Sequence, residues 1–169
     1  MNKFSFLSLI VGSTFISSSA FAAVDPEVSY ILNTLLFLIG GFLVMWMAAG
    51  FAMLESGLVT SKSVATIAAK NIGLYSIAGL MFWFIGYNLA YGIPEGGFIG
   101  TLLPWSDASS IETGYSDGSD WFFQMVFCAT TCSIVSGTMA ERIKIWPFFL
   151  FCAILAGVIY PIEMGWQWG

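Results

Sequence analysis

Long stretches without a charged residue constrain this chain more than any other feature. Segments 29–54 and 71–92 contain no Asp, Glu, Lys or Arg, and a helix needs about 20 predominantly apolar residues to cross a bilayer. Only 9% of the chain is charged, whereas about a quarter of a soluble domain is charged. The sequence therefore predicts an all-α integral membrane protein with four transmembrane helices, at about 29–54, 63–92, 121–139 and 145–166.

The first 22 residues have the composition of a secretory signal peptide. Lys3 is followed by the apolar run "FSFLSLIVGSTFI" and then by small residues around Ala20 and Ala22, an order typical of a cleaved signal. We expect a signal peptide at 1–22 and a mature domain at 23–169 whose N-terminus lies outside the cytoplasm. The alternative is a first membrane anchor, but the apolar run is shorter than the about 20 residues that a span needs.

The charges of the three connections predict an orientation. The connection at 93–120 contains five acidic residues and no Lys or Arg, whereas Lys62, Lys70, Arg142 and Lys144 lie in or near the other two. Because basic residues collect in cytoplasmic loops, we expect the acidic loop to face outward from the cell (inner) membrane. The lipid bilayer is then a partner, and the net charge of −5 argues against nucleic acid.

Aromatic residues gather where the third and fourth predicted helices reach the outer side. Phe123 and Phe127 stand four apart, so they lie on one helical face, and Trp166 and Trp168 end the fourth helix at the same level. Aromatic faces hold a cation with about 0.5 to 2 kcal/mol per contact. The alternative is that these rings are interfacial anchors and packing residues, which membrane helices also use.

Four segments carry a resemblance to a known family. "GFAMLESGLVTSKSVATIAAKNI", "FWFIGYNLAYG", "FFQMVFCATTCSIVSGTMAERIK" and "VIYPIEMGWQWG" resemble the first four transmembrane helices of the ammonium transporter (Amt/Mep/Rh) family. That resemblance implies the N-terminal portion of a fold of about eleven helices in two inverted halves, assembled as a homotrimer. It implies ammonium as the substrate, no cofactor, no enzymatic activity and a cytoplasmic regulatory protein as an additional partner.

The resemblance also implies roles for individual residues. Phe127 matches the pore-gating phenylalanine, Phe123 the aromatic ring one turn above it, Gln124 its neighbouring glutamine, and Trp168 the tryptophan of the outer vestibule. In the family, ammonium is recruited there and loses its proton before it crosses an apolar pore lined by two histidines. The chain contains no histidine, and the family's pore histidines and recruitment-site aspartate come from later helices.

We therefore expect an N-terminal fragment that conducts no ammonium by itself. Two alternatives stay open: an ammonium sensor built on the same membrane domain, and a membrane piece that transports nothing. For the remaining polar groups we expect structural roles, with Glu55 bonding to neighbouring helices, Lys70 and Asn71 anchoring the second helix, and Glu141 pairing with Arg142. Cys128, Cys132 and Cys152 lie in apolar runs, where cysteine usually acts as a small buried hydrophobe.

Overall fold

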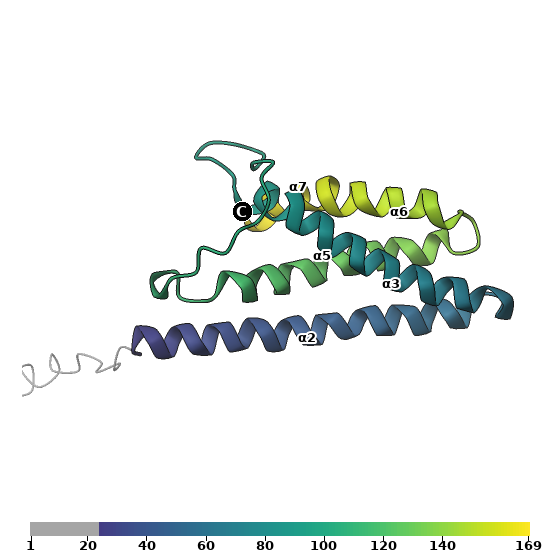
Figure 1. Cartoon of the computed structure of the whole chain (residues 1–169), viewed down its shortest axis with the longest axis horizontal. Coiled ribbons are helices and arrows are strands. Elements are labelled where there is room, and N and C mark those ends of the chain that lie inside the picture. The colour runs from purple at the N-terminus through teal and green to yellow at the C-terminus, as the bar shows by residue number, and fades with distance from the viewer. Residues whose placement is uncertain (1–23) are drawn as a thin grey trace, which may run out of the picture.

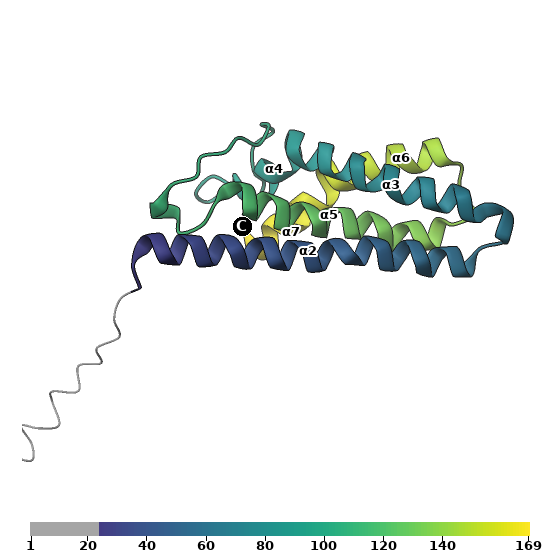
Figure 2. The same cartoon turned by 60° about the horizontal axis from the view of Figure 1, so that its bottom comes forward.

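The computed structural model describes residues 24–169 as a bundle of long helices (Figures 1 and 2). The predicted signal peptide, 1–22, lies outside the described residues. The first element is α2, Pro26–Leu58, whose N-terminus is capped by the Asp25 carboxylate accepting from the Glu27 backbone N–H. Pro26 suits the first helical position because its missing N–H would have no partner there.

The second long helix is continuous but changes its pitch. It comprises η1 (Ser61–Ser63), α3 (Val64–Met81), a π-helical turn η2 (Phe82–Gly86) and α4 (Tyr87–Tyr91). The fourth long helix repeats this arrangement with α6 (Ile145–Ile154), the π-helical turn η4 (Leu155–Ile159) and α7 (Tyr160–Trp168). The two π-helical turns pack against each other.

The third long helix, α5 (Asp117–Met139), lies in the middle of the bundle and packs against α2 and α3. With it, the described part of the chain contains four helices that are long and apolar enough to cross a membrane. The predicted all-helical membrane architecture is confirmed. The helices extend beyond the predicted spans, since α2 begins at Pro26 and the fourth helix ends at Trp168.

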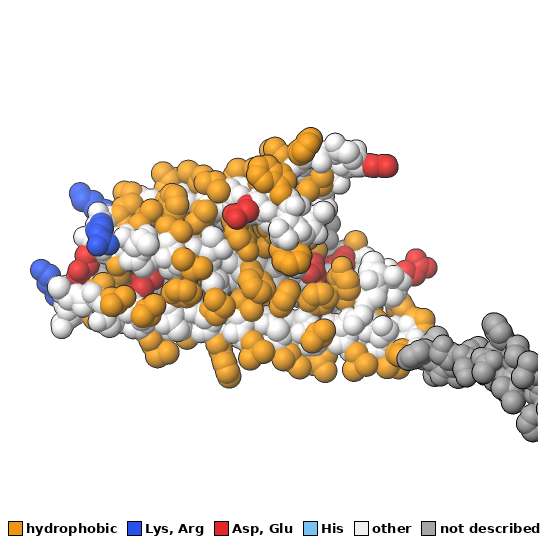
Figure 3. Space-filling model, turned by 180° about the vertical axis from the view of Figure 1, so that it is seen from behind, with side chains coloured by type: hydrophobic (Ala, Val, Ile, Leu, Met, Phe, Trp, Pro, Cys, Tyr) orange, Lys and Arg blue, Asp and Glu red, His pale blue; other side chains and the backbone are white. Residues whose placement is uncertain are grey.

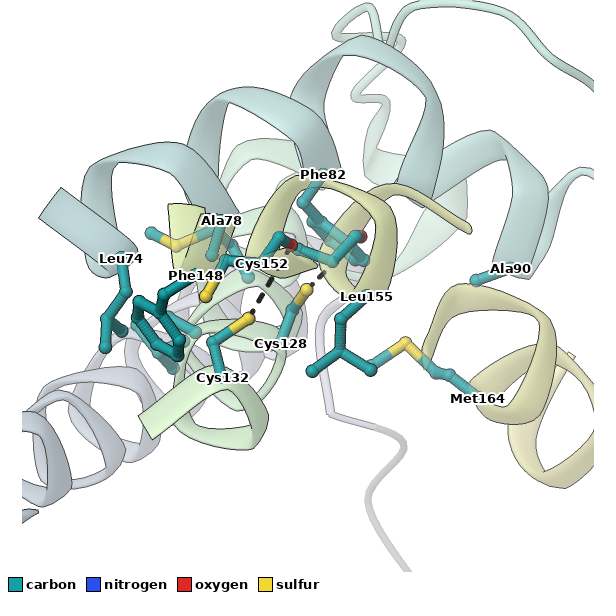
Figure 4. Packing of buried hydrophobic residues seen from close by; sticks show 14 residues of the cluster. Leu74, Ala78, Phe82, Ala90, Cys128, Cys132, Phe148, Cys152, Leu155 and Met164 are labelled. Carbon is teal, nitrogen blue, oxygen red and sulfur yellow. Dashed lines mark hydrogen bonds between the residues drawn. The ribbon is translucent and has the colours of Figure 1, made fainter. Parts of the chain in front are cut away.

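Small side chains and thiols allow α5 to pack closely against its neighbours. Cys128, Cys132 and Cys152 are free and buried. The thiol of Cys128 donates to the carbonyl of Ala156 at 3.4 Å, and that of Cys132 to the carbonyl of Cys152 at 3.9 Å (Figure 4). The interpretation of the cysteines as buried hydrophobes is therefore confirmed, with weak hydrogen bonds added.

A buried ion pair and a serine hydroxyl link three helices. Lys70 Nζ of α3 lies 2.8 Å from Glu55 Oε2 of α2, and the Ser136 hydroxyl of α5 donates to both Glu55 oxygens at 2.7 and 2.9 Å. Lys70 also donates to the Ser136 carbonyl at 3.1 Å. The expected structural role of Glu55 thus takes the form of a three-helix network.

The expected pairing of Glu141 with Arg142 is wrong. Glu141 accepts from the Thr60 backbone N–H at 3.0 Å and from the Thr60 hydroxyl at 2.6 Å, whereas Arg142 donates to the Thr138 carbonyl at 2.7 Å. Glu141 has a φ of 61°, and this left-handed conformation directs its carboxylate across to the turn after α2. Adjacent positions in a sequence need not face each other.

The two ends of the bundle differ in charge. Lys62, Arg142 and Lys144 lie at the end that holds the turns 59–63 and 140–144, which we call the basic end (Figure 3). The opposite, acidic end carries the connection 92–116. There, the Asn33 side chain donates to the Gly114 carbonyl at 2.9 Å, and the Ser116 backbone N–H donates to the Thr34 hydroxyl at 3.0 Å.

Candidate functional site

A recess of about 620 Å³ opens at the acidic end and collects side chains from five parts of the chain. A recess of this volume has room for several water molecules, so a hydrated small ion can enter without losing all its water. Most of the lining side chains are aromatic. They are Phe37 of α2, Tyr87 and Tyr91 of α4, Tyr115 of the connection, Asp120, Phe123, Gln124 and Phe127 of α5, and Tyr160, Met164 and Trp168 of α7.

The α5 wall of this recess is built on helical spacing. The rings of Phe123 and Phe127 lie 5.1 Å apart, centroid to centroid, at an interplanar angle of 79°. They form an edge-to-face pair on one helical face, as their spacing of four residues predicts. The Phe37 ring of α2 continues the cluster, 5.4 Å from Phe123 and 5.0 Å from Tyr115.

A single carboxylate stands among these rings. The side chain of Asp120 accepts from the Tyr87 hydroxyl at 2.7 Å through Oδ2 and from the Gln124 amide at 3.2 Å through Oδ1. Asp120 is 7% exposed and lies in the first turn of α5, where the helix dipole favours a negative charge. The recess therefore combines ring faces with one fixed negative group.

The phenol of Tyr115, which lines the recess, stays neutral. Burial raises the pKa of Tyr115, and the nearby carboxylates of Asp120 and Asp117 raise this pKa further. A neutral phenol adds no charge to the recess. The ring contributes apolar surface and a hydroxyl group.

Helix α7 contributes three residues spaced four apart to the recess, Tyr160, Met164 and Trp168. Trp166 lies outside this set. Its indole N–H donates to the Phe98 carbonyl of the connection at 2.8 Å. The two tryptophans of α7 thus have different surroundings: Trp168 lines the recess, and Trp166 is hydrogen-bonded to the connection.

The structure places all four residues of the sequence prediction on one recess, namely Phe123, Gln124, Phe127 and Trp168. Sequence reasoning missed Asp120, which falls within the acidic connection predicted at 93–120, and it missed Tyr87, Tyr91 and Tyr160. A signal for these residues exists in the sequence, because residues four apart lie on the same face of a helix. Tyr87 and Tyr91 have this spacing, and so do Tyr160, Met164 and Trp168.

The chemistry of the recess favours a small organic or inorganic cation. Ring faces attract a cation without binding it as firmly as a full counter-charge does, and the carboxylate adds longer-range attraction. Among the described residues, no group of three or more His, Cys, Asp or Glu side chains could hold a metal ion.

The chain is similar to a family of known proteins. Residues 35–169 match the family described as the Ammonium Transporter Family. The chain is 42% identical over 138 residues to the ammonium transporter Amt2 of Archaeoglobus fulgidus, covering 78% of this chain and 28% of that protein. It is 36% identical over 149 residues to a putative ammonium transporter of Synechocystis, covering 85% of this chain and 33% of that protein.

A solved structure described as a sensor Amt protein is also similar. It superimposes with a TM-score of 0.77 at 29% sequence identity, covering 86% of this chain and 36% of that one. The chain spans about a quarter to a third of the length of the curated relatives named above.

Proposed function

The chain belongs to the ammonium transporter family, and from that premise we propose that it builds the cation-recruiting part of a protein that moves ammonium across the cell membrane. Its four long apolar helices and its relatives make it a multi-pass membrane protein. In this proposal the signal peptide at 1–22 is cleaved and the acidic end faces outward. The recess then meets ammonium before any other part of the described chain does.

The observation that carries the proposal is the convergence of Phe123, Phe127 and Trp168 on one recess with a carboxylate beside them. Three ring faces at about 0.5 to 2 kcal/mol each are strong enough to concentrate a cation and weak enough to release it. A recess of about 620 Å³ is much larger than one ammonium ion. It acts as a vestibule that collects the ion while part of its hydration shell is kept.

Loss of the proton would follow recruitment. A charged group at the centre of a bilayer costs about 2.5–3.5 kcal/mol on insertion scales and more in simulations, so a neutral species crosses at a lower cost. The edge-to-face pair of Phe123 and Phe127 lies on the route inward from the rim along α5. In our proposal it excludes water and hydrated cations from the deeper path, which later parts of a complete transporter would supply.

Uptake of radiolabelled methylammonium tests this proposal. The protein, at the full length that its gene encodes, is expressed in cells that lack other ammonium uptake systems. We expect Trp168→Leu to reduce uptake at low substrate concentration about tenfold, as a loss of about 1.4 kcal/mol of cation binding implies. We expect Phe127→Ala to change both rate and selectivity, because a gap replaces one ring of the pair.

Trp166→Leu is the matched control, because Trp166 lies on the same helix but bonds to Phe98 instead of lining the recess. Uptake within about twofold of the wild type is expected for it. If neither Phe127→Ala nor Trp168→Leu alters uptake, the assignment of the recess as the recruiting site is wrong.

A second candidate function is sensing, which the similarity to a sensor Amt protein favours. A sensor would bind the cation in the same recess without moving it across the membrane. Flux into proteoliposomes separates the two functions. Binding of methylammonium without any flux would support sensing over transport.

A further inference from the structure

Asp120 is a buried carboxylate without a basic partner in the described part of the chain. The one ion pair among the described residues joins Lys70 to Glu55, and Lys62, Arg142 and Lys144 lie at the basic end (Figure 3). A charge that is 7% exposed and unpaired is costly to keep, so such a group in a membrane protein usually has a functional role.

Neutral donors hold this carboxylate in place. Tyr87 donates to Oδ2 at 2.7 Å and Gln124 to Oδ1 at 3.2 Å, and the first turn of α5 adds a favourable dipole. These contacts stabilise the negative charge without neutralising it. An ionised carboxylate has about four lone-pair positions, so about half of its acceptor capacity remains for a ligand.

The same carboxylate lines the recess together with the rings of Phe123, Phe127 and Trp168. Ring faces attract cations weakly and with little dependence on their chemical type, whereas a fixed negative charge attracts a cation and repels an anion. The carboxylate makes the recess prefer cations over anions, and the three rings keep the binding weak enough to be readily reversible. The rings alone would leave that selectivity weak.

We propose that Asp120 is the charge-selective residue of the recess, where its carboxylate attracts a small ammonium-class cation, and that Tyr87 and Gln124 are the positioning residues that aim it. This inference rests on the proposed function and adds to it the group that selects the cation. Gln124, predicted from the sequence as a binding residue, then acts through Asp120.

Equilibrium binding of radiolabelled methylammonium to the purified full-length protein, with uptake measured in parallel, tests this inference. Asp120→Asn keeps the shape and an acceptor for Tyr87 but removes the charge, whereas Asp120→Glu changes the shape but keeps the charge. We expect Asp120→Asn to weaken binding about tenfold and Asp120→Glu to stay within about threefold of the wild type. A merely structural Asp120 would give the opposite order, because Asn is the closer match in shape.

Two controls complete the series. Asp117→Asn removes a charge from the same helical turn, where Asp117 accepts from the Ala108 backbone N–H at 3.0 Å and does not line the recess. Tyr87→Phe keeps the Asp120 charge and removes one positioning bond. We expect less than a twofold change for Asp117→Asn and about a two- to threefold loss of affinity for Tyr87→Phe.

The outcomes separate this inference from the proposed function. Equal binding by the wild type and Asp120→Asn, or equal losses in Asp120→Asn and Asp120→Glu, would overturn the role of Asp120 even if the wild type transports methylammonium. If the wild type binds methylammonium but does not take it up, the proposed transport function is wrong. The binding data for the Asp120 variants would still test the role of Asp120. A wild type that neither binds nor transports would overturn both.

Discussion

At the scale of single residues, Glu141 shows how a backbone conformation decides which partner a side chain meets. Its φ of 61° is a conformation that costs non-glycine residues about 1–2 kcal/mol. In exchange, its carboxylate accepts two hydrogen bonds from Thr60. This contact fastens the turn after α5 to the turn after α2 at the basic end.

The Thr60 contact predicts a pH-dependent stability. Hydrogen bonds from the Thr60 side chain, then those from Ser63 and the Thr60 backbone, lower the pKa of Glu141 below its ordinary value. A lowered carboxyl pKa stabilises the fold above the unfolded value of about 4.3, and this contribution is lost as the pH falls through the lowered pKa.

Glu141→Gln should therefore lower the melting temperature of the purified protein slightly at pH 7, on the order of 1 °C because the group is exposed. The difference should disappear at a second, acidic pH below the lowered pKa, where the wild-type carboxyl becomes protonated too. Thermal unfolding of the two proteins at both pH values measures this. A difference that is the same at both pH values would show that the charge of Glu141 is irrelevant.

At the scale of elements, the network of Glu55, Lys70 and Ser136 fixes how α2, α3 and α5 approach one another. Glu55 is 2% exposed and Lys70 is 5% exposed, so each charge depends on the other. Removing one partner of a buried ion pair typically costs about 3–5 kcal/mol, whereas replacing both with apolar groups is often close to neutral.

Lys70→Met should accordingly be severely destabilising, by about 3–5 kcal/mol, because it leaves the Glu55 carboxylate buried and unpaired. The double variant Glu55→Leu with Lys70→Met should recover at least half of that loss. Thermal unfolding in detergent and the yield of folded protein measure the effect. A double variant that is less stable than Lys70→Met alone would contradict this account of the network.

The contact between α7 and α4 requires a residue without a side chain at Gly165. A Cβ placed there would lie 2.7 Å from the Ala90 carbonyl oxygen, which is backbone and cannot rotate away. Gly165→Ala should therefore push α7 outward, at a cost of about 1–3 kcal/mol, and move Trp168 with it. We expect a loss of stability together with reduced methylammonium uptake.

Gly57→Ala is the matched control, because a Cβ at Gly57 in α2 meets nothing within 4 Å. Alanine in an open helical position stabilises by about 0.5–1 kcal/mol relative to glycine. Opposite signs of the two stability changes would confirm that the close approach at Gly165, and not helix propensity, decides the outcome.

The sequence allowed the helices to be predicted but not their irregularities. Four long helices follow from charge-free runs such as 29–54, because the bilayer demands length and apolarity, and both are visible in the sequence. The π-helical turns at Phe82–Gly86 and Leu155–Ile159 were not visible, since they depend on how the second and fourth long helices meet. The partners of Asp120 were missed for the same reason: Tyr87 lies 33 residues away.

At the scale of the whole molecule, charge is distributed along the long axis of the bundle. The acidic connection 92–116 lies at one end, and Lys62, Arg142 and Lys144 lie at the other (Figure 3). Under the positive-inside rule this polarity supports our proposal that the recess faces the outer side. This polarity is thus consistent with the proposed function, in which ammonium enters the recess from outside.

Cysteine labelling tests this orientation, because the three native cysteines of the described residues, Cys128, Cys132 and Cys152, are buried and shielded from the reagent. In spheroplasts, whose cell membrane is intact, a membrane-impermeant maleimide should label the Glu112→Cys variant. Lys62→Cys should react only after the membrane is permeabilised, because both native side chains are exposed but on opposite ends. The reverse pattern would overturn the proposed orientation.

The paired π-helical turns have a consequence for how such a chain can change over time. Each wide turn shifts the residues that follow it by one position, about 100° around a regular helix. The face of α7 that carries Tyr160, Met164 and Trp168 is thereby out of phase with α6. Helix α6 contributes no residue to the recess, so substitutions at its exposed side chains, such as Leu150, can accumulate without altering the lining. Deleting one residue from Leu155–Ile159, by contrast, would rotate α7 relative to α6. Tyr160, Met164 and Trp168 would then turn away from the recess together.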